Sequence, residues 1–404
     1  MKIIQLVSNL NYGDAIGNDI IAKDRMLRQA GYETTIMALA VHPRLQELAK
    51  EVDIKSISPD DMVIFHKASG DALTDLFLKM NCHKVLLYHN ITPAEFFIHY
   101  DLLMAVNLMR GRKQLKQMAG QIKTAWGDSE YNCDELRRLG FRRVRKLPIY
   151  VEFDRAPADP VRLEELKREA GRKFLFVGRI APNKKQEDVI KAVATYQQMF
   201  DESAKLYLIG SHAQGDKYYA KVRGFTDDTD VKNVIYPGHV TDEEKNAYFE
   251  AADAFICMSE HEGFCVPLLE AMHRQIPVVA YRCAAVPETL GENGLLVDQK
   301  NYREIALMIH SVVEDAEKRK AVIQHQNAKL KEYTLEAVQE RFLELIDEAL
   351  RDDGQTNMDN RPDFKPLWKI HNPTYRQLRK GTFKKRVRHY AGRIYRTIVP
   401  KTKK

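Results

Sequence analysis

Two carboxylates stand eight residues apart where a short apolar run gives way to a helical pattern. Glu262 lies in the connecting loop and Glu270 lies inside the predicted helix. Carboxylate oxygens accept protons from hydroxyl groups, so such a pair suits a polyhydroxylated ligand. Gly263 allows a ligand to approach the backbone closely, and Pro267 fits the first turn of a helix. The free N–H groups at that helix start could bind phosphate or hydroxyl oxygens.

A second group of candidate residues follows another apolar run. Gly178 and Arg179 form a turn, and Lys184 stands at the start of the next predicted helix. A guanidinium offers a rigid fork of donors to phosphate, and an ammonium adds a point charge. Together they could neutralise a diphosphate. The alternative is that both cations are solvated loop charges.

Two further loops also follow predicted strands. The first, residues 12–19, contains Gly13, Asp14 and Asp19 but lacks the usual glycine-rich nucleotide fingerprints. Either aspartate could contact an acceptor hydroxyl, or could equally cap a helix. The second loop begins at His89, whose ring has either a structural role or a role in binding.

The elements that position these residues alternate between strands and helices. The predicted strands are 3–7, 33–39, 62–66, 84–89, 123–126 and 145–149, and then 173–177, 205–209, 233–236, 254–258, 277–281 and 295–297. The segment 147–160, rich in proline and acidic residues, separates the two series. This alternation predicts an α/β fold with two doubly wound parallel sheets. Ligands are then expected in a cleft at the carboxyl ends of the strands.

The chain of 404 residues therefore divides into four expected segments. They are an N-terminal Rossmann-like domain at 1–150, a second at 151–335, a closing helix at 336–351, and a spacer with a basic tail at 352–404. Apolar residues make up 44% and charged residues 29%, which excludes wholly disordered and collagen-like chains. The five cysteines show no Cys-x-x-Cys spacing, so we expect free thiols and no zinc site.

The formal net charge of +7 is distributed unevenly. Residues 361–404 contain 15 Lys and Arg and one acid, which gives +14 and leaves −7 on residues 1–360. Within 374–399, apolar residues recur at helical spacing among the cations. A cationic amphipathic helix suits an anionic membrane surface. Packing on the body or on a partner protein is the alternative, and the acidic body argues against nucleic acid.

Together these motifs resemble the GT-B glycosyltransferases, specifically the retaining glycosyl transferases group 1, or family 4. The Glu-x7-Glu pattern, the Val-Gly-Arg with its later Lys, the glycine loop and His89 occur in the family's order, over about residues 1–350. The segments 13–19 and 89–93 look like a bacterial branch that acts on cell-surface polysaccharides. The resemblance implies two Rossmann-like domains facing a central cleft.

The resemblance also implies roles for individual residues. The catalytic residues would be Arg179, Lys184, Glu262 and His89. The donor-binding residues would be Gly13, Gly178, Gly263, Phe264, Glu270, Gly238, His239 and Val240. In this assignment the two cations hold the donor diphosphate, Glu270 binds the ribose, and Glu262 and His89 contact the sugar. The acceptor would meet Asp14 or Asp19, and no metal or other cofactor is expected.

The activity implied is transfer of a hexose, with mannose favoured, from a nucleotide-diphosphate sugar to a saccharide or lipid-linked acceptor. Such reactions belong to synthesis of cell-surface polysaccharides, including lipopolysaccharide. The N-terminus lacks a secretion signal, and no apolar run reaches the roughly 18 residues of a membrane span. We therefore expect a cytoplasmic protein, peripheral on the inner face of the cell membrane.

Other functions remain open at this point. Asp228 and Asp230 form an Asp-x-Asp that could hold a metal in a transferase of the other major fold. A sugar-nucleotide epimerase or a phosphorylase could share the two-domain architecture. A non-catalytic scaffold of a polysaccharide assembly complex is a further alternative.

Overall fold

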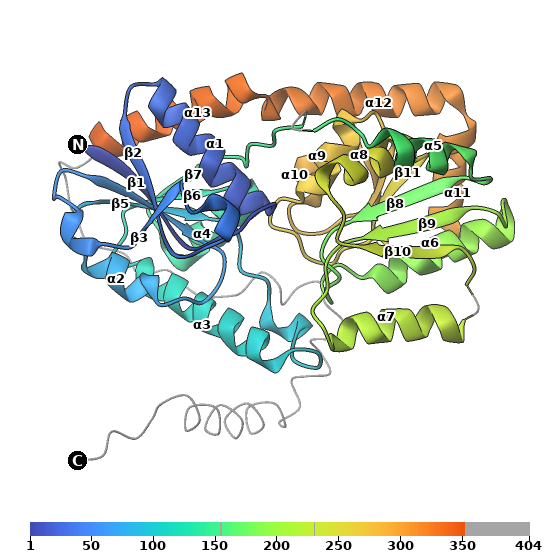
Figure 1. The fold of residues 1–404 in the computed structure, drawn as a ribbon, viewed down its shortest axis with the longest axis horizontal. Coiled ribbons are helices and arrows are strands. Elements are labelled where there is room, and N and C mark those ends of the chain that lie inside the picture. Colours follow the sequence, from blue (N-terminus) through green and yellow to red (C-terminus); the bar gives the residue numbers. More distant parts are fainter. Residues whose placement is uncertain (154–155, 230, 352–404) are drawn as a thin grey trace, which may run out of the picture. The chain divides into compact units, whose positions relative to one another are not determined.

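The chain forms two separate parallel β-sheets, each wrapped by helices (Figure 1). The structure is a computed structural model that describes residues 1–153, 156–229 and 231–351. These residues belong to one compact unit. The basic segment predicted at 374–399 lies outside the described residues. No described helix has both the length and the apolar character needed to cross a bilayer.

The first sheet has the strand order β3-β2-β1-β4-β5-β6-β7. Its strands are β1 Lys2–Leu10, β2 Glu33–Val41, β3 Ala49–Glu51, β4 Met62–Lys67, β5 His83–Tyr88, β6 Thr124–Gly127 and β7 Arg143–Lys146. Its α-helices are α1 Ala15–Gln29, α2 Leu73–Lys79, α3 Leu102–Met118 and α4 Glu130–Leu139, with short 3₁₀ turns at Pro43–Leu45, Ile54–Ser56 and Ala94–Phe96. All the neighbouring strands run parallel, with Ile3 of β1 opposite Met62 of β4.

The second sheet has the order β10-β9-β8-β11-β12-β13 and is also parallel. Its strands are β8 Lys173–Val177, β9 Lys205–Ile209, β10 Val234–Gly238, β11 Ala254–Cys257, β12 Val278–Tyr281 and β13 Leu295–Val297. The helices of this half are α5 Pro160–Arg168, α6 Gln186–Met199, α7 Lys217–Asp228, α8 Asp242–Ala251, α9 Val266–His273, α10 Val286–Leu290, α11 Tyr302–Glu314 and α12 Ala316–Leu330. A turn at Lys331–Tyr333 then leads into α13, Leu335–Arg351.

Both faces of each sheet are covered, which explains the nearly continuous apolar runs of the central strands. In β1, Ile4 and Leu6 pack in a cluster with Phe65 on one face of the sheet. Ile3 packs in the cluster on the other face, with Trp126. Because the core occupies both faces, the polar residues gather where the strands end.

The last helix, α13, packs on the first sheet although it follows the second in the chain (Figure 1). Phe342 is fully buried and its ring meets Trp126 edge-on, with 6.2 Å between ring centroids. Arg145 and Glu348 add an ion pair of 3.0 Å. The chain thus crosses from the first sheet to the second and returns.

The two doubly wound sheets confirm the predicted α/β architecture, with differences in detail. The edge strand β3 and helix α5 were not predicted, and β7 begins two residues before the expected start at 145. In the Asp-x-Asp pattern, Asp228 is the last residue of α7, while Asp230 lies outside the described residues. Short edge strands and helices of about two turns carry too few apolar residues for a clear periodic pattern.

Candidate active site

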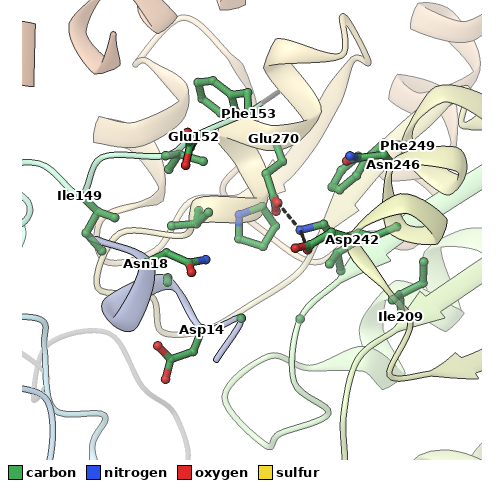
Figure 2. Close-up of a pocket in the computed structure, with 18 of the residues that line it drawn as sticks. Asp14, Asn18, Ile149, Glu152, Phe153, Ile209, Asp242, Asn246, Phe249 and Glu270 are labelled. Carbon is green, nitrogen blue, oxygen red and sulfur yellow. Dashed lines mark hydrogen bonds and ion pairs between the residues drawn. The ribbon is translucent and has the colours of Figure 1, made fainter. Parts of the chain in front are cut away.

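A cavity of about 480 Å³ opens where strands of both sheets end (Figure 2). Gly13 and Asp14 line it from the loop after β1. Gly178, Arg179 and the loop after β10 line it from the other sheet, and Glu270 of α9 faces the space in Figure 2. The volume is in the range of ordinary small-molecule sites. We refer to it as the large cavity.

A second cavity has a volume of about 210 Å³ and is called the small cavity. It is lined by His89, Lys184, Glu262 and Gly263 from loops of both sheets. Arg179 lines both cavities. An exposed guanidinium at that boundary can contact one ligand that extends through both spaces.

The backbone around Arg179 is held by its neighbouring strand. Ile180 donates its N–H to the Ser211 carbonyl at 3.1 Å. A Cβ at Gly210 would overlap the carbonyl oxygen of Gly178, so the two strand ends approach closely only because residue 210 is glycine. This fixes the point from which Arg179 extends.

Lys184 and Glu262 form an ion pair in the small cavity. The Lys184 ammonium donates to both oxygens of the carboxylate, at 2.7 and 2.6 Å. Burial alone would lower the pKa of Lys184, but the adjacent Glu262 carboxylate outweighs it and raises that pKa. Lys184 is therefore a permanent cation, and an anionic ligand must compete with Glu262 for it.

The large cavity contains a similar arrangement. Lys245 of α8 lies 2.8 Å from Glu270 and 3.1 Å from Asp242, as the dashed lines of Figure 2 show. Burial opposes the charge of Lys245, but Glu270 raises its pKa overall. Glu270 still has its second carboxylate oxygen for a ligand hydroxyl.

The ring of His89 points into the protein and not into the small cavity. Its side chain is 1% exposed. Nε2 lies 3.0 Å from Nδ1 of His66, and Nδ1 lies 3.4 Å from the Asp128 carboxylate. Burial raises the pKa of Asp128. In this conformation, His89 can meet a sugar only through its backbone.

The acceptor contact predicted for Asp19 is not available in this conformation, because the side chain is fully buried. It forms an ion pair with buried Lys23 and accepts the N–H of Tyr150 at 2.9 Å. Asp14 lines the large cavity and also caps α1, accepting the N–H of Gly17 at 2.6 Å. The capping expected of Asp14 is therefore confirmed, and its contact with an acceptor stays a prediction.

Some of the remaining predicted donor residues line a cavity and others do not. His239 and Val240 line the large cavity. Gly238 and Phe264 are not among the lining residues. Gly238 adopts φ 78°, a conformation that favours glycine. Phe264 is buried, and its carbonyl accepts the Thr289 hydroxyl at 2.6 Å.

Two groups of metal-ligating side chains occur among the described residues, each with ligand atoms within 4.8 Å of one another. They are Asp19 with His66 and His89, and Cys257 with Glu262 and Cys265. In each group a lysine ammonium already pairs with the carboxylate. A metal ion would have to displace Lys23 or Lys184.

Comparison with known proteins identifies the second half of the chain. Residues 160–329 match the family model described as glycosyl transferases group 1. This segment contains Arg179, Lys184, Glu262 and Glu270. Residues 160–329 are thus similar to this family, and we call them the group 1 domain.

Individual relatives match part of the chain. The Escherichia coli O-antigen chain mannosyltransferase B is 30% identical over 166 residues, which are 40% of this chain and 42% of that protein. The 2-deoxystreptamine glucosyltransferase of Streptomyces kanamyceticus is 29% identical over 246 residues, 58% of this chain and 60% of that protein. The matched part of this chain thus spans between about two fifths and three fifths of those relatives.

The fold likeness extends over both sheets. The crystal structure of Anabaena HepE in complex with UDP and glucose has a TM-score of 0.69 and 16% identity. It covers 86% of this chain and 100% of that one. The sucrose-phosphate synthase of Thermosynechococcus elongatus gives a TM-score of 0.67 with 15% identity, covering 87% of this chain and all of that one. These likenesses establish the GT-B fold.

Several residues at the large and small cavities were not predicted from the sequence. Lys245 pairs with Glu270, and Asn90 faces the small cavity from the loop after β5. Asn90 has φ 72°, which asparagine adopts more readily than most residues. Neither residue carries a local pattern of its own. A lysine on a polar helix face resembles any solvated cation until Glu270 is placed beside it.

His261 provides a measurable consequence of this environment. It is 5% exposed, and its Nε2 lies 2.7 Å from Asn90 Oδ1. Burial, then the positive charges of Arg112 and Lys184, lower the pKa of His261 to about 3. Between pH 7 and pH 5 the unfolded state therefore gains a proton that the folded state does not. The free energy of unfolding should fall by about 2 kcal/mol over this interval from His261 alone.

We predict that His261→Gln makes stability less dependent on pH. Urea denaturation at pH 7 and pH 5 gives the change in the free energy of unfolding between the two pH values, for wild type and for the variant. The loss of stability on acidification should be smaller in the variant by up to about 2 kcal/mol. Equal losses in both proteins would contradict a neutral buried His261.

Proposed function

We propose that the protein is a retaining, metal-independent glycosyltransferase that moves a hexose from a nucleotide-diphosphate sugar to a saccharide or lipid-linked acceptor. The observation that carries the proposal is the position of Arg179, which lines both cavities. In the small cavity it lies with the ion pair of Lys184 and Glu262. A nucleoside fits the large cavity, and its diphosphate then lies at the boundary. The sugar occupies the small cavity.

The chemistry follows from charge. As the bond from sugar to diphosphate breaks, negative charge develops on the leaving phosphate. Arg179 and Lys184 stabilise that charge in place of a metal ion. Lys184 exchanges its Glu262 partner for phosphate, which frees the Glu262 carboxylate to accept a sugar hydroxyl. Glu270 accepts hydroxyls of the ribose.

Transfer with retention requires the acceptor to reach the face of the sugar that the diphosphate leaves. Asp14 lines the large cavity and is the residue that we propose to contact the acceptor. Named relatives transfer mannose and glucose, so these hexoses are the first candidates, and the O-antigen relative favours a role in surface polysaccharides.

A panel of nucleotide sugars tests the proposal directly. The full chain is incubated with GDP-mannose, UDP-glucose and related donors, and thermal stabilisation and release of the free nucleotide are measured. We expect one donor to stabilise the protein and to be hydrolysed slowly, with EDTA making no difference. A product whose sugar changed configuration without transfer would favour an epimerase. Absence of binding by every donor would favour the scaffold alternative.

Replacing Arg179 separates binding from chemistry. Arg179→Ala should lower kcat by about 10²–10³-fold, because charge stabilisation is lost mainly in the transition state. Arg303→Ala, at an exposed site in α11, is the matched control and should retain wild-type turnover. Steady-state kinetics with the preferred donor measures both. Near wild-type turnover in a folded Arg179→Ala protein would refute the assignment.

We further propose that residues 374–399 hold the protein against an anionic membrane, on the cytoplasmic face where lipid-linked acceptors would be reached. The support is the +14 charge of residues 361–404 beside a body of −7. Each basic residue near such a surface contributes about 1 kcal/mol at physiological ionic strength.

Charge-matched variants of the full chain test this attachment. One variant carries glutamine at Lys384, Lys385, Arg388 and Arg396. The control carries glutamine at Lys50, Lys55, Arg303 and Lys320, which are exposed on the body. In sedimentation with phosphatidylglycerol vesicles, only the first variant should lose binding. Equal loss in both variants, or in neither, would refute the proposal.

A further inference from the structure

The loop that carries Glu262 is held by residues of the other sheet. The carbonyl of the next residue, Gly263, accepts a hydrogen bond from the Ser129 hydroxyl at 2.7 Å. It also accepts one from the Asn132 amide at 3.3 Å. Both donors lie at the start of α4, so one helix start in the first sheet's half holds one peptide of the group 1 domain.

Asn90 completes this contact from the loop after β5. Its amide nitrogen donates to the Asn132 amide oxygen at 2.6 Å, and its own oxygen lies 2.7 Å from His261 Nε2. The Asn132 nitrogen also donates to the Asp128 carboxylate. Each oxygen therefore accepts and each nitrogen donates, which leaves one orientation for both amides.

Gly263 is required here because there is no room for a side chain. A Cβ at this position would lie 2.6 Å from the Cβ of Asn90 and 3.1 Å from the carbonyl oxygen of His89. Separations below 3 Å cannot be accommodated without moving the backbone. The glycine therefore serves the contact between the two halves of the chain.

The contact also sets the geometry of the small cavity. In a trans peptide the carbonyl and the following N–H point in opposite directions, so fixing the Gly263 carbonyl fixes the direction of the Phe264 N–H. Glu262 precedes this peptide directly and lines the cavity with His89 and Asn90. Residues from both halves of the chain therefore surround the cavity only when the Gly263 carbonyl accepts the hydrogen bonds of Ser129 and Asn132.

We propose that Ser129 and Asn132, with Asn90 orienting the Asn132 amide, form a socket for the Gly263 carbonyl, and that all three act as positioning residues for the sugar site. Seating of Gly263 completes the small cavity, while the large cavity can bind the nucleotide without it. The inference rests on the proposed transferase function for its kinetic consequences. The socket itself is independent of that function.

A double-variant cycle tests whether glycine is required at residue 263 because a side chain there would clash with Asn90. Gly263→Ala should lower kcat by about 10²-fold through misplacement of the loop, with nucleotide affinity unchanged. Asn90→Gly removes the opposing Cβ and suits φ 72°. The combined variant should therefore be more active than Gly263→Ala alone, although Asn90→Gly by itself lowers activity. If each substitution only destabilised the fold, the combined variant would be less active than Gly263→Ala.

A second variant tests the hydrogen bonds without relying on activity. Asn132→Asp keeps the size of the side chain but places a carboxylate against Asp128 and the Gly263 carbonyl. Hydrogen exchange of backbone amides in residues 258–265 should become faster. Asn301→Asp is the matched control, because either residue can cap α11 at this exposed site, and it should leave that exchange unchanged.

The outcomes separate the socket from the proposed function. If no nucleotide sugar binds wild type, the transferase proposal fails, and the exchange experiment still decides the socket. If a donor binds and its sugar is transferred, the double-variant cycle decides whether the socket positions the sugar site. The inference is overturned if the combined variant is no more active than Gly263→Ala, or if exchange in 258–265 is the same in Asn132→Asp and wild type.

Discussion

Parallel strand direction is the constraint on which the site depends. In a parallel sheet every loop after a strand emerges at the same edge. The loops after β1, β5 and β6 therefore share one edge of the first sheet, and those after β8, β10 and β11 share one edge of the second. Apolar residues cover both faces, so the charged side chains of the site lie at these edges and not on the faces of the sheets.

The lysines and glutamates that line the two cavities pair with one another. In the absence of ligand, Lys184 neutralises Glu262 and Lys245 neutralises Glu270. Each pair avoids the cost of a lone buried charge. A diphosphate and a set of hydroxyls can satisfy the cation and the carboxylate separately. Arg179 is exposed at the boundary of the two cavities, where a phosphate could reach it.

Sequence patterns predicted some of these residues well and others for the wrong reason. Glu262, Gly263 and Lys184 were expected near one another, and they do line one cavity. Close approach of a ligand to Gly263 stays a prediction: the residue lines the small cavity, and its missing side chain also leaves room for Asn90. The His89 ring was a candidate for sugar binding, yet it is enclosed between His66 and Asp128. Such contacts join residues far apart in the chain and leave no local spacing to detect.

The sequence by itself determined the two doubly wound sheets, because apolar runs and helical periodicity are local properties of the chain. It also determined which loops carry glycine, arginine, lysine and glutamate at strand ends. Only the tertiary structure decided the partners. The pairs of Lys245 with Glu270 and of Asn132 with Gly263 arise when elements from separate parts of the chain pack together. Burial and direction of a side chain depend on that packing, which residue type alone does not encode.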